Sequence, residues 1–256
     1  MSKKYFFATT VIFFHCAFAN SLYKSESHAM CDIAAGFINF EFVQGWECNI
    51  NSTIFDICND SISTWEGVQC QVDSIVGISL EGYNIAGTIS YSIGYLANLQ
   101  YLLLGYNALE GTLPSTLGLL SKVATLSLTS NYFSGEFPST LGFMINLQSC
   151  DIELNQLTST IPFSRGYLSI LQYFSLYSNK LTGTIPTSII QLTSLIYLDI
   201  SSNMISGTIP IGIGNMTQLS QIRLCSTNLS GKIPTSIGYL IGITQLGLCS
   251  TRITGH

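Results

Sequence analysis

Two acidic side chains, Asp151 and Glu153, come nearest to a catalytic pair in this chain of 256 residues. Carboxyl groups two residues apart on a strand project from one face and could serve as general acid and general base. Histidine, the usual partner of a nucleophile, occurs at His15, His28 and His256, all outside the central part of the chain. The sequence therefore favours solvated strand carboxylates, and we expect neither enzymatic activity nor a cofactor.

A second group of side chains could recognise a ligand. Tyrosine combines apolar area with a hydroxyl group, which suits recognition surfaces. Tyr173 and Tyr197 are 24 residues apart, and so are Asp199 and Arg223. The candidate ligand-binding residues are Tyr101, Asp151, Glu153, Tyr173, Tyr177, Tyr197, Asp199 and Arg223. The alternative for the tyrosines is that aromatic residues simply favour strands.

An apolar repeat with the same period supplies the elements that would position these side chains. Leucine or isoleucine recurs at Leu80, Leu104, Leu128, Ile152, Leu176, Ile200, Leu224 and Leu248. A second apolar series runs two residues earlier, and asparagine follows at Asn107, Asn131, Asn155, Asn179 and Asn203. This pattern is typical of a leucine-rich-repeat solenoid. It predicts short parallel strands with alternate residues buried, and an asparagine ladder that satisfies buried backbone groups at the turns.

The second half of each repeat carries Gly-x-Ile-Pro, as in Gly183 to Pro186. Glycine permits the turn and proline fixes φ, which leaves room for only a turn of helix. We therefore predict an α/β repeat solenoid, a right-handed leucine-rich-repeat horseshoe. A parallel β-sheet should line its concave face, with loops and 3₁₀ segments on the convex face. Residues 75–256 would form seven full 24-residue repeats and a partial eighth.

The chain before the array is of a different kind. Lys3 and Lys4, an apolar run and Ala17-Phe18-Ala19 predict a secretory signal peptide over residues 1–19. Residues 20–74 lack the repeat and should form an N-terminal cap, because a solenoid end must be covered. This region contains Cys31, Cys48, Cys58 and Cys70. Short loops favour the pairs 31–48 and 58–70, and the lack of a C-x-x-C pair argues against zinc.

The remaining cysteines lie in the array. Cys225 and Cys249 are one period apart, and they could form a disulfide or remain thiols. Neighbouring parallel strands are a poor geometry for a bridge, so thiols are the favoured expectation. Cys150 replaces an inward apolar residue and should be a small buried hydrophobe.

The net charge and the glycosylation sequons indicate which classes of partner and modification the chain could have. Loss of Lys3 and Lys4 with the signal peptide leaves 7 basic against 14 acidic residues, a balance of −7. That balance argues against nucleic acid, which requires a basic patch. Glycosylation sequons begin at Asn51, Asn59, Asn215 and Asn228. A secreted chain could carry glycans at these positions.

Two segments carry a specific resemblance. The stretch from Leu198 to Pro210 resembles the plant-type leucine-rich repeats of receptor-like kinases, receptor-like proteins and polygalacturonase-inhibiting proteins, and the stretch from Trp65 to Cys70 resembles their N-terminal cap. The resemblance implies a secreted or cell-surface module that binds a protein, peptide or glycan on its concave or lateral face, with a co-receptor as a further partner. Inhibition of a wall-degrading hydrolase is an alternative. Membrane attachment would require a segment beyond His256.

A threonine series suggests a rival function. Threonine recurs at Thr88, Thr112, Thr160, Thr184 and Thr208. Regular Thr-x-Thr arrays on a flat face can order water, and some plant leucine-rich-repeat proteins resemble ice-binding solenoids. Glu136 and Lys232 interrupt the series. Ice binding is therefore retained as the alternative to recognition of a ligand.

Overall fold

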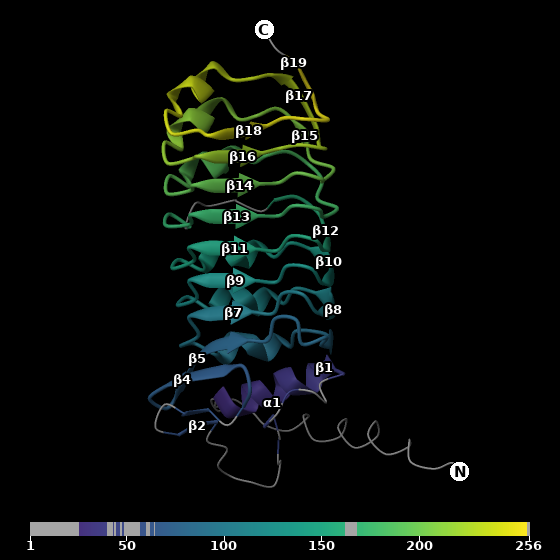
Figure 1. Cartoon of the computed structure of the whole chain (residues 1–256), viewed down its shortest axis with the longest axis vertical. Helices are drawn as coiled ribbons and strands as arrows, with labels where there is room; N and C mark the ends of the chain where they lie inside the picture. Colours follow the sequence, from purple (N-terminus) through teal and green to yellow (C-terminus); the bar gives the residue numbers. More distant parts are fainter. Residues whose placement is uncertain are drawn as a thin grey trace, which may run out of the picture.

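The protein is an elongated stack of coils (Figure 1). The computed structural model describes residues 26–39, 43, 45–46, 48, 57–59, 62–63, 65–161 and 168–254. The predicted signal peptide lies outside these ranges. Within them, no helix has the length and apolar character that a membrane crossing requires.

One face of the stack is a nine-stranded sheet. Its strands, in spatial order, are β4 (Val68–Gln71), β5 (Ser74–Ser79), β7 (Tyr101–Leu103), β9 (Thr125–Ser127), β11 (Ser149–Asp151), β13 (Tyr173–Ser175), β14 (Tyr197–Asp199), β16 (Gln221–Arg223) and β18 (Gln245–Gly247). β4 runs antiparallel to β5, and the others are parallel. Tyr173 pairs with Tyr197, and Asp199 pairs with Arg223. The predicted stacking at intervals of one repeat is confirmed.

Short strands also pair along another face, which the sequence analysis did not predict. They form two groups, β1 (Phe37–Ile38), β6 (Ala86–Gly87), β8 (Ala108–Thr112), β10 (Tyr132–Glu136) and β12 (Gln156–Thr158), then β15 (Ser206–Gly207), β17 (Asn228–Lys232) and β19 (Arg252–Thr254). We call these strands together the second sheet. Thr112 pairs with Ser134, so the register advances by 22 residues per coil instead of 24.

Single turns of 3₁₀-helix follow the second sheet, as predicted for the convex side. They are η2 (Tyr91–Tyr95), η3 (Ser115–Leu119), η4 (Ser139–Phe143), η5 (Thr187–Gln191), η6 (Ile211–Asn215) and η7 (Thr235–Tyr239). Proline precedes most of them in extended backbone, as Pro114 does at φ −68°. Because proline has no N–H, it leaves no unpaired donor where each turn begins.

A helix covers the first coil. α1 (Glu26–Gly36) buries Met30 and Ile33. The Glu26 carboxylate accepts a hydrogen bond from the Ile75 N–H at 2.8 Å, and Asp32 accepts one from the Ser92 hydroxyl at 2.6 Å. These contacts bind the covering helix to the array.

Two disulfides lie in the same region, which also includes the strand pair β2 (Cys58–Asn59) and β3 (Ile62–Ser63). Cys31 is joined to Cys48 and Cys58 to Cys70, with Cα–Cα distances of 5.7 and 5.5 Å. This is the pairing that the short loops favour. The sequence analysis expected a cap here but did not predict its helix.

The asparagine ladder organises the interior of the turns. Asn131 is 5% exposed. Its Oδ1 accepts from the Leu109 N–H at 2.9 Å, and its Nδ2 donates to the carbonyls of Leu104, Leu128 and Thr129 at 2.9–3.2 Å. One side chain thus connects consecutive coils and satisfies buried backbone groups that would otherwise be costly.

The last coils depart from this pattern. Thr227 stands in place of asparagine, and its hydroxyl donates to the Leu224 carbonyl at 2.8 Å. Cys225 and Cys249 form a disulfide with a Cα–Cα distance of 4.6 Å, so the expectation of thiols was wrong. Both cysteines come after the ends of their strands, where the chain turns. The side-chain directions of regular parallel strands, which disfavour a bridge, therefore do not apply to them. Cys150 is buried as a free thiol, and burial raises its pKa.

Candidate functional site

Two tyrosines stack on the nine-stranded sheet. Tyr173 on β13 and Tyr197 on β14 have ring centroids 4.4 Å apart and planes inclined by 5°. The 24-residue register places them side by side, and the spacing of parallel strands matches the stacking distance. Burial raises the pKa of both hydroxyls, and neighbouring carboxylates raise them further. The pair is a rigid, half-buried aromatic surface.

A charged network holds one side of the stack. The guanidinium carbon of Arg223 lies 5.2 Å from the Tyr197 ring centroid, and its Nη1 donates to the Tyr197 hydroxyl at 3.0 Å. Nη1 is also 3.8 Å from Asp199 Oδ2. Asp199 is 4% exposed and accepts from the Tyr197 hydroxyl and from the Ser201 N–H. Asp199 was a candidate ligand-binding residue, and its carboxylate oxygens are engaged within the protein.

The carboxylates on the other side of the stack are more accessible. Glu153 accepts from the Ser175 hydroxyl at 2.9 Å, and the Glu153 N–H lies 3.3 Å from Asp151 Oδ1. Burial raises the pKa of Asp151 to about 6, helped by the negative charges of Glu153 and Glu81. No histidine lies on the described strands of this sheet. The raised pKa of Asp151 therefore reflects burial and like charge.

Glu81 joins this acidic group although the sequence analysis did not single it out. It occupies the same repeat position as Glu153, three periods earlier, which is the signal that could have found it. Its Oε1 accepts from the Ser127 hydroxyl at 2.9 Å. A Cβ built on Gly105 would lie 3.1 Å from that oxygen and 2.9 Å from the Thr129 methyl group. The glycine thus gives the Glu81 side chain room to cross a coil toward Asp151.

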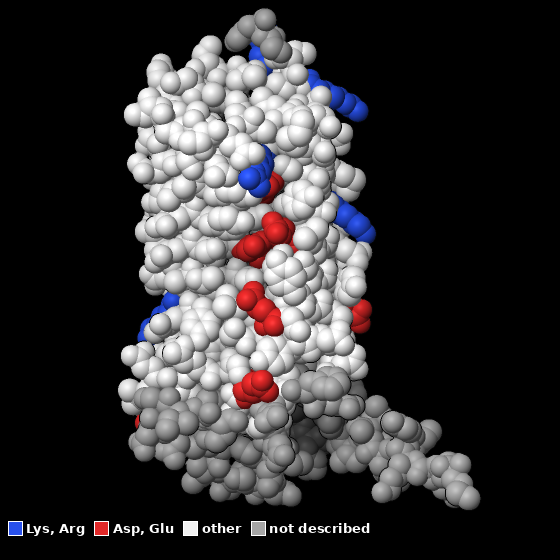
Figure 2. All heavy atoms as spheres, in the orientation of Figure 1, with Lys and Arg blue, Asp and Glu red and all other residues white. Residues whose placement is uncertain are grey.

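The structure brings together six of the eight candidates, and we call Asp151, Glu153, Tyr173, Tyr197, Asp199 and Arg223 the concave strip. Figure 2 shows acidic side chains in a column along this face, with a basic side chain near its upper part. Tyr177 follows β13 and is 36% exposed, so it borders the strip. Tyr101 is separate, since its hydroxyl donates to Gln69 and its ring covers Gly77.

The described sequons lie away from the strip. Asn215 is exposed at the end of η6, and Asn228 is exposed at the start of β17. Asn51 and the side chain of Asn59 lie outside the described part of the chain. Glycans at Asn215 and Asn228 would leave the nine-stranded sheet uncovered.

The threonine series lies on and beside the second sheet, and its members are exposed. Each threonine methyl group packs over the glycine of the next coil, as Thr160 does over Gly183, where an added Cβ would lie 2.6 Å away. Beside this column, the hydroxyls of Thr158 and Ser206 donate to carbonyls of the preceding coil at 3.0 Å. The column is therefore regular and fixed in orientation.

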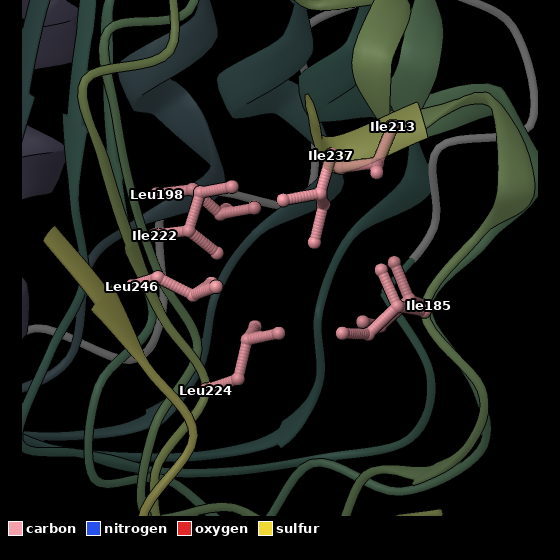
Figure 3. A pocket seen from close by; sticks show the side chains of 8 residues that line it. Ile185, Leu198, Ile213, Ile222, Leu224, Ile237 and Leu246 are labelled. Atoms are coloured by element: carbon pink, nitrogen blue, oxygen red, sulfur yellow. The ribbon is translucent and has the colours of Figure 1, made fainter. Parts of the chain in front are cut away.

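A small cavity lies within the apolar core of the later coils. Figure 3 shows aliphatic side chains around it, among them Ile185, Leu198, Ile213 and Ile237. Its volume is about 10 Å³, the space of one water molecule at most, and polar groups to hold a water are absent from its lining. It reflects imperfect packing and cannot hold a small-molecule ligand.

Comparison with known proteins agrees with the fold. The family model described as Leucine Rich Repeat matches residues 98–120, 171–192 and 194–216. The ectodomain of the Arabidopsis thaliana membrane receptor kinase GASSHO1/SCHENGEN3, solved with CASPARIAN STRIP INTEGRITY FACTOR 2, is 28% identical with a TM-score of 0.73. That alignment covers 90% of this chain and 30% of the receptor chain. No curated protein matches significantly.

Two further solved structures are informative. The plant peptide hormone receptor RGFR1, in complex with RGF2, is 28% identical with a TM-score of 0.56, over 66% of this chain and 31% of that one. A plant ice-binding protein is 22% identical with a TM-score of 0.69, over 90% of this chain and 71% of that one, a likeness of fold alone. The chain is a leucine-rich-repeat solenoid similar to plant receptor-kinase ectodomains, and it spans about a third of the length of those two receptors.

Proposed function

We propose that this protein is an extracellular recognition module that binds a peptide, or a peptide segment of a protein, on the concave strip. The observation that carries the proposal is the Tyr173–Tyr197 stack. Arg223 and Asp199 hold it on the Tyr197 side, and the carboxylates of Asp151 and Glu153 lie on the Tyr173 side. Rings held in place before binding lose little conformational freedom when a ligand arrives.

The neighbouring structures support this proposal. Two of them are receptors in complex with CASPARIAN STRIP INTEGRITY FACTOR 2 and with RGF2, and one of these is named a peptide hormone receptor. The disulfides of this chain suit an oxidising compartment. We extend the proposal to a location outside the cell or at its surface, and to a co-receptor that shares the ligand.

A random peptide library displayed on phage tests the proposal directly. Peptides that bind the wild-type protein should lose most of their affinity for the Tyr173→Ala/Tyr197→Ala variant. The matched control is Tyr132→Ala, which removes a tyrosine that is 57% exposed on the second sheet. If the double variant binds as the wild type does, or if Tyr132→Ala has the larger effect, the concave strip is not the binding surface.

Ice binding is the second candidate, favoured by the exposed threonine column. Its methyl groups sit in fixed positions over glycines, which gives the regular spacing that ordered water requires. Glu136 and Lys232, both exposed, break the column into short runs. Thermal hysteresis of the purified protein would establish this function, and its absence at millimolar protein concentration would exclude it.

Inhibition of a wall-degrading hydrolase would be a form of protein recognition on the concave strip.

A further inference from the structure

We propose that the face of Tyr173 directed toward Ser149 binds an arginine side chain of the ligand. The inference rests on the proposed function and adds the chemistry of the ligand to it. Tyr173 uses one ring face to stack on Tyr197. The opposite face is directed along the sheet toward β11, where Ser149 is the paired residue. Serine is too small to cover the ring, so a planar group can lie against it.

The protein's own Arg223 shows the arrangement that such a group would adopt. Its guanidinium lies over Tyr197, donates to the Tyr197 hydroxyl and lies near the Asp199 carboxylate. Aromatic face, carboxylate and guanidinium are thus already combined at one end of the stack. At the other end, Tyr173 supplies the ring and Asp151 and Glu153 supply the carboxylates. The guanidinium is the missing component.

Within the described part of the chain, the lysine and arginine side chains are engaged or placed away from this end of the stack. Among the described residues, Lys122 donates to Asn98 at 2.7 Å and Lys180 donates to Gln156 at 3.0 Å. Lys232 and Arg252 belong to strands of the second sheet. Three carboxylates, on Glu81, Asp151 and Glu153, therefore have no basic partner among the residues that the structure describes, a charge distribution that a cationic ligand complements.

A buried hydroxyl occupies the same repeat position as two of these carboxylates. Thr129 lies in the same repeat position as Glu81 and Glu153, between them, and is 3% exposed. Its Oγ1 is the one buried side-chain polar atom among the described residues that has no hydrogen-bond partner. Such an atom costs free energy where it is buried. The five N–H donors of a guanidinium suit the carboxylate acceptors of Asp151 and Glu153.

Arginine suits the site better than lysine because of its shape. The guanidinium is planar, stacks on an aromatic face and can donate two parallel hydrogen bonds to one carboxylate. An ammonium would gain the charge attraction but not the stacking. The site should therefore rank arginine above lysine and lysine above a neutral side chain.

The test uses peptides selected from the random library on the full wild-type protein. Recovered peptides should be enriched in arginine relative to the unselected library. One such peptide is then resynthesised with citrulline, which keeps the shape of arginine and removes its charge. We expect citrulline to weaken binding to the wild type about tenfold. The same change should have little effect on binding to Asp151→Asn/Glu153→Gln, and its full effect on Glu136→Gln, which loses the same kind of charge elsewhere.

The outcomes separate this inference from the proposed function. Peptides that lose affinity for Tyr173→Ala but show no arginine enrichment, or tolerate citrulline, would overturn the arginine site and leave the recognition surface intact. Peptides indifferent to Tyr173→Ala would overturn both. Thermal melting of Asp151→Asn/Glu153→Gln checks its folding, which should be retained because the change relieves like-charge repulsion. If that variant fails to fold, the citrulline comparison on the wild type still decides.

Discussion

Replacing Asn131 by alanine should lower the free energy of unfolding of the solenoid by more than the loss of one exposed amide would. The carbonyls that Asn131 contacts keep other donors, since Leu104 still accepts from Asn107 and Leu128 still accepts from Asn155. The Leu109 N–H, at the start of β8, donates to the Asn131 oxygen at 2.9 Å. Alanine therefore leaves one buried donor unpaired and removes the link between coils.

The magnitude follows from that count. An unsatisfied buried donor costs about 1–3 kcal/mol, so we expect Asn131→Ala to lower the free energy of unfolding by about 2 kcal/mol. Thr227 is the comparison within the same ladder, because its hydroxyl donates to the single carbonyl of Leu224. Thr227→Ala should cost about 1 kcal/mol or less.

Urea unfolding followed by circular dichroism measures both variants under the same conditions. The exposed Asn146 serves as the control, since its amide reaches only the Ser121 carbonyl and Asn146→Ala should change stability by less than about 0.5 kcal/mol. If Asn131→Ala costs no more than Thr227→Ala, the ladder does not hold the coils together through satisfied amides, and the reasoning fails.

Three other perturbations give measurable outcomes. Burial raises the folded-state pKa of Asp151 from 3.8 to about 6, so the folded state holds the proton more tightly and the free energy of unfolding should fall as pH rises from about 4 to 6. Asp151→Asn should raise the free energy of unfolding by about 1 kcal/mol at pH 7, after allowance for solvent screening, and thermal melting at several pH values should show a flatter slope. Replacing Cys225 and Cys249 by alanine should cost up to about 3 kcal/mol for a loop of this length, with faster amide exchange confined to the last coils; unchanged exchange would rule out a stabilising bridge. Gly183→Ala should destabilise by more than about 1 kcal/mol, because φ is +76° and the Thr160 methyl is in the way; Thr160→Ser should recover part of the loss, and no recovery would contradict the packing of methyl on glycine.

The repeat made most of the array predictable. Residues such as Leu104 and Asn131 recur at a fixed interval, and an interval of one coil determines which side chains become neighbours. The stacking of Tyr173 on Tyr197 followed from that interval alone. The burial of Asp199 did not, because it depends on how far the Arg223 side chain folds back over Tyr197.

The repeat pattern could not predict three other features: the second sheet, the α1 helix and the position of Glu81. In β8, β10 and β12 only the second residue of each strand is buried, as Phe133 is in β10, so the strands of the second sheet give too short an alternation to be recognised. The α1 helix belongs to the region without repeats. Glu81 was missed because its neighbours Ser127 and Asp151 are two and three coils away. Gly105 has no side chain, which leaves room for the Glu81 side chain to extend across that coil toward them.

The most direct test of the recognition surface is a crystal structure of the protein with a peptide selected from the random library. The account predicts that the peptide crosses β11, β13 and β14, with an arginine against the free face of Tyr173 and its guanidinium within hydrogen-bonding distance of Asp151 or Glu153. A peptide bound on the second sheet or along the 3₁₀ turns, with Tyr173 still exposed, would contradict it.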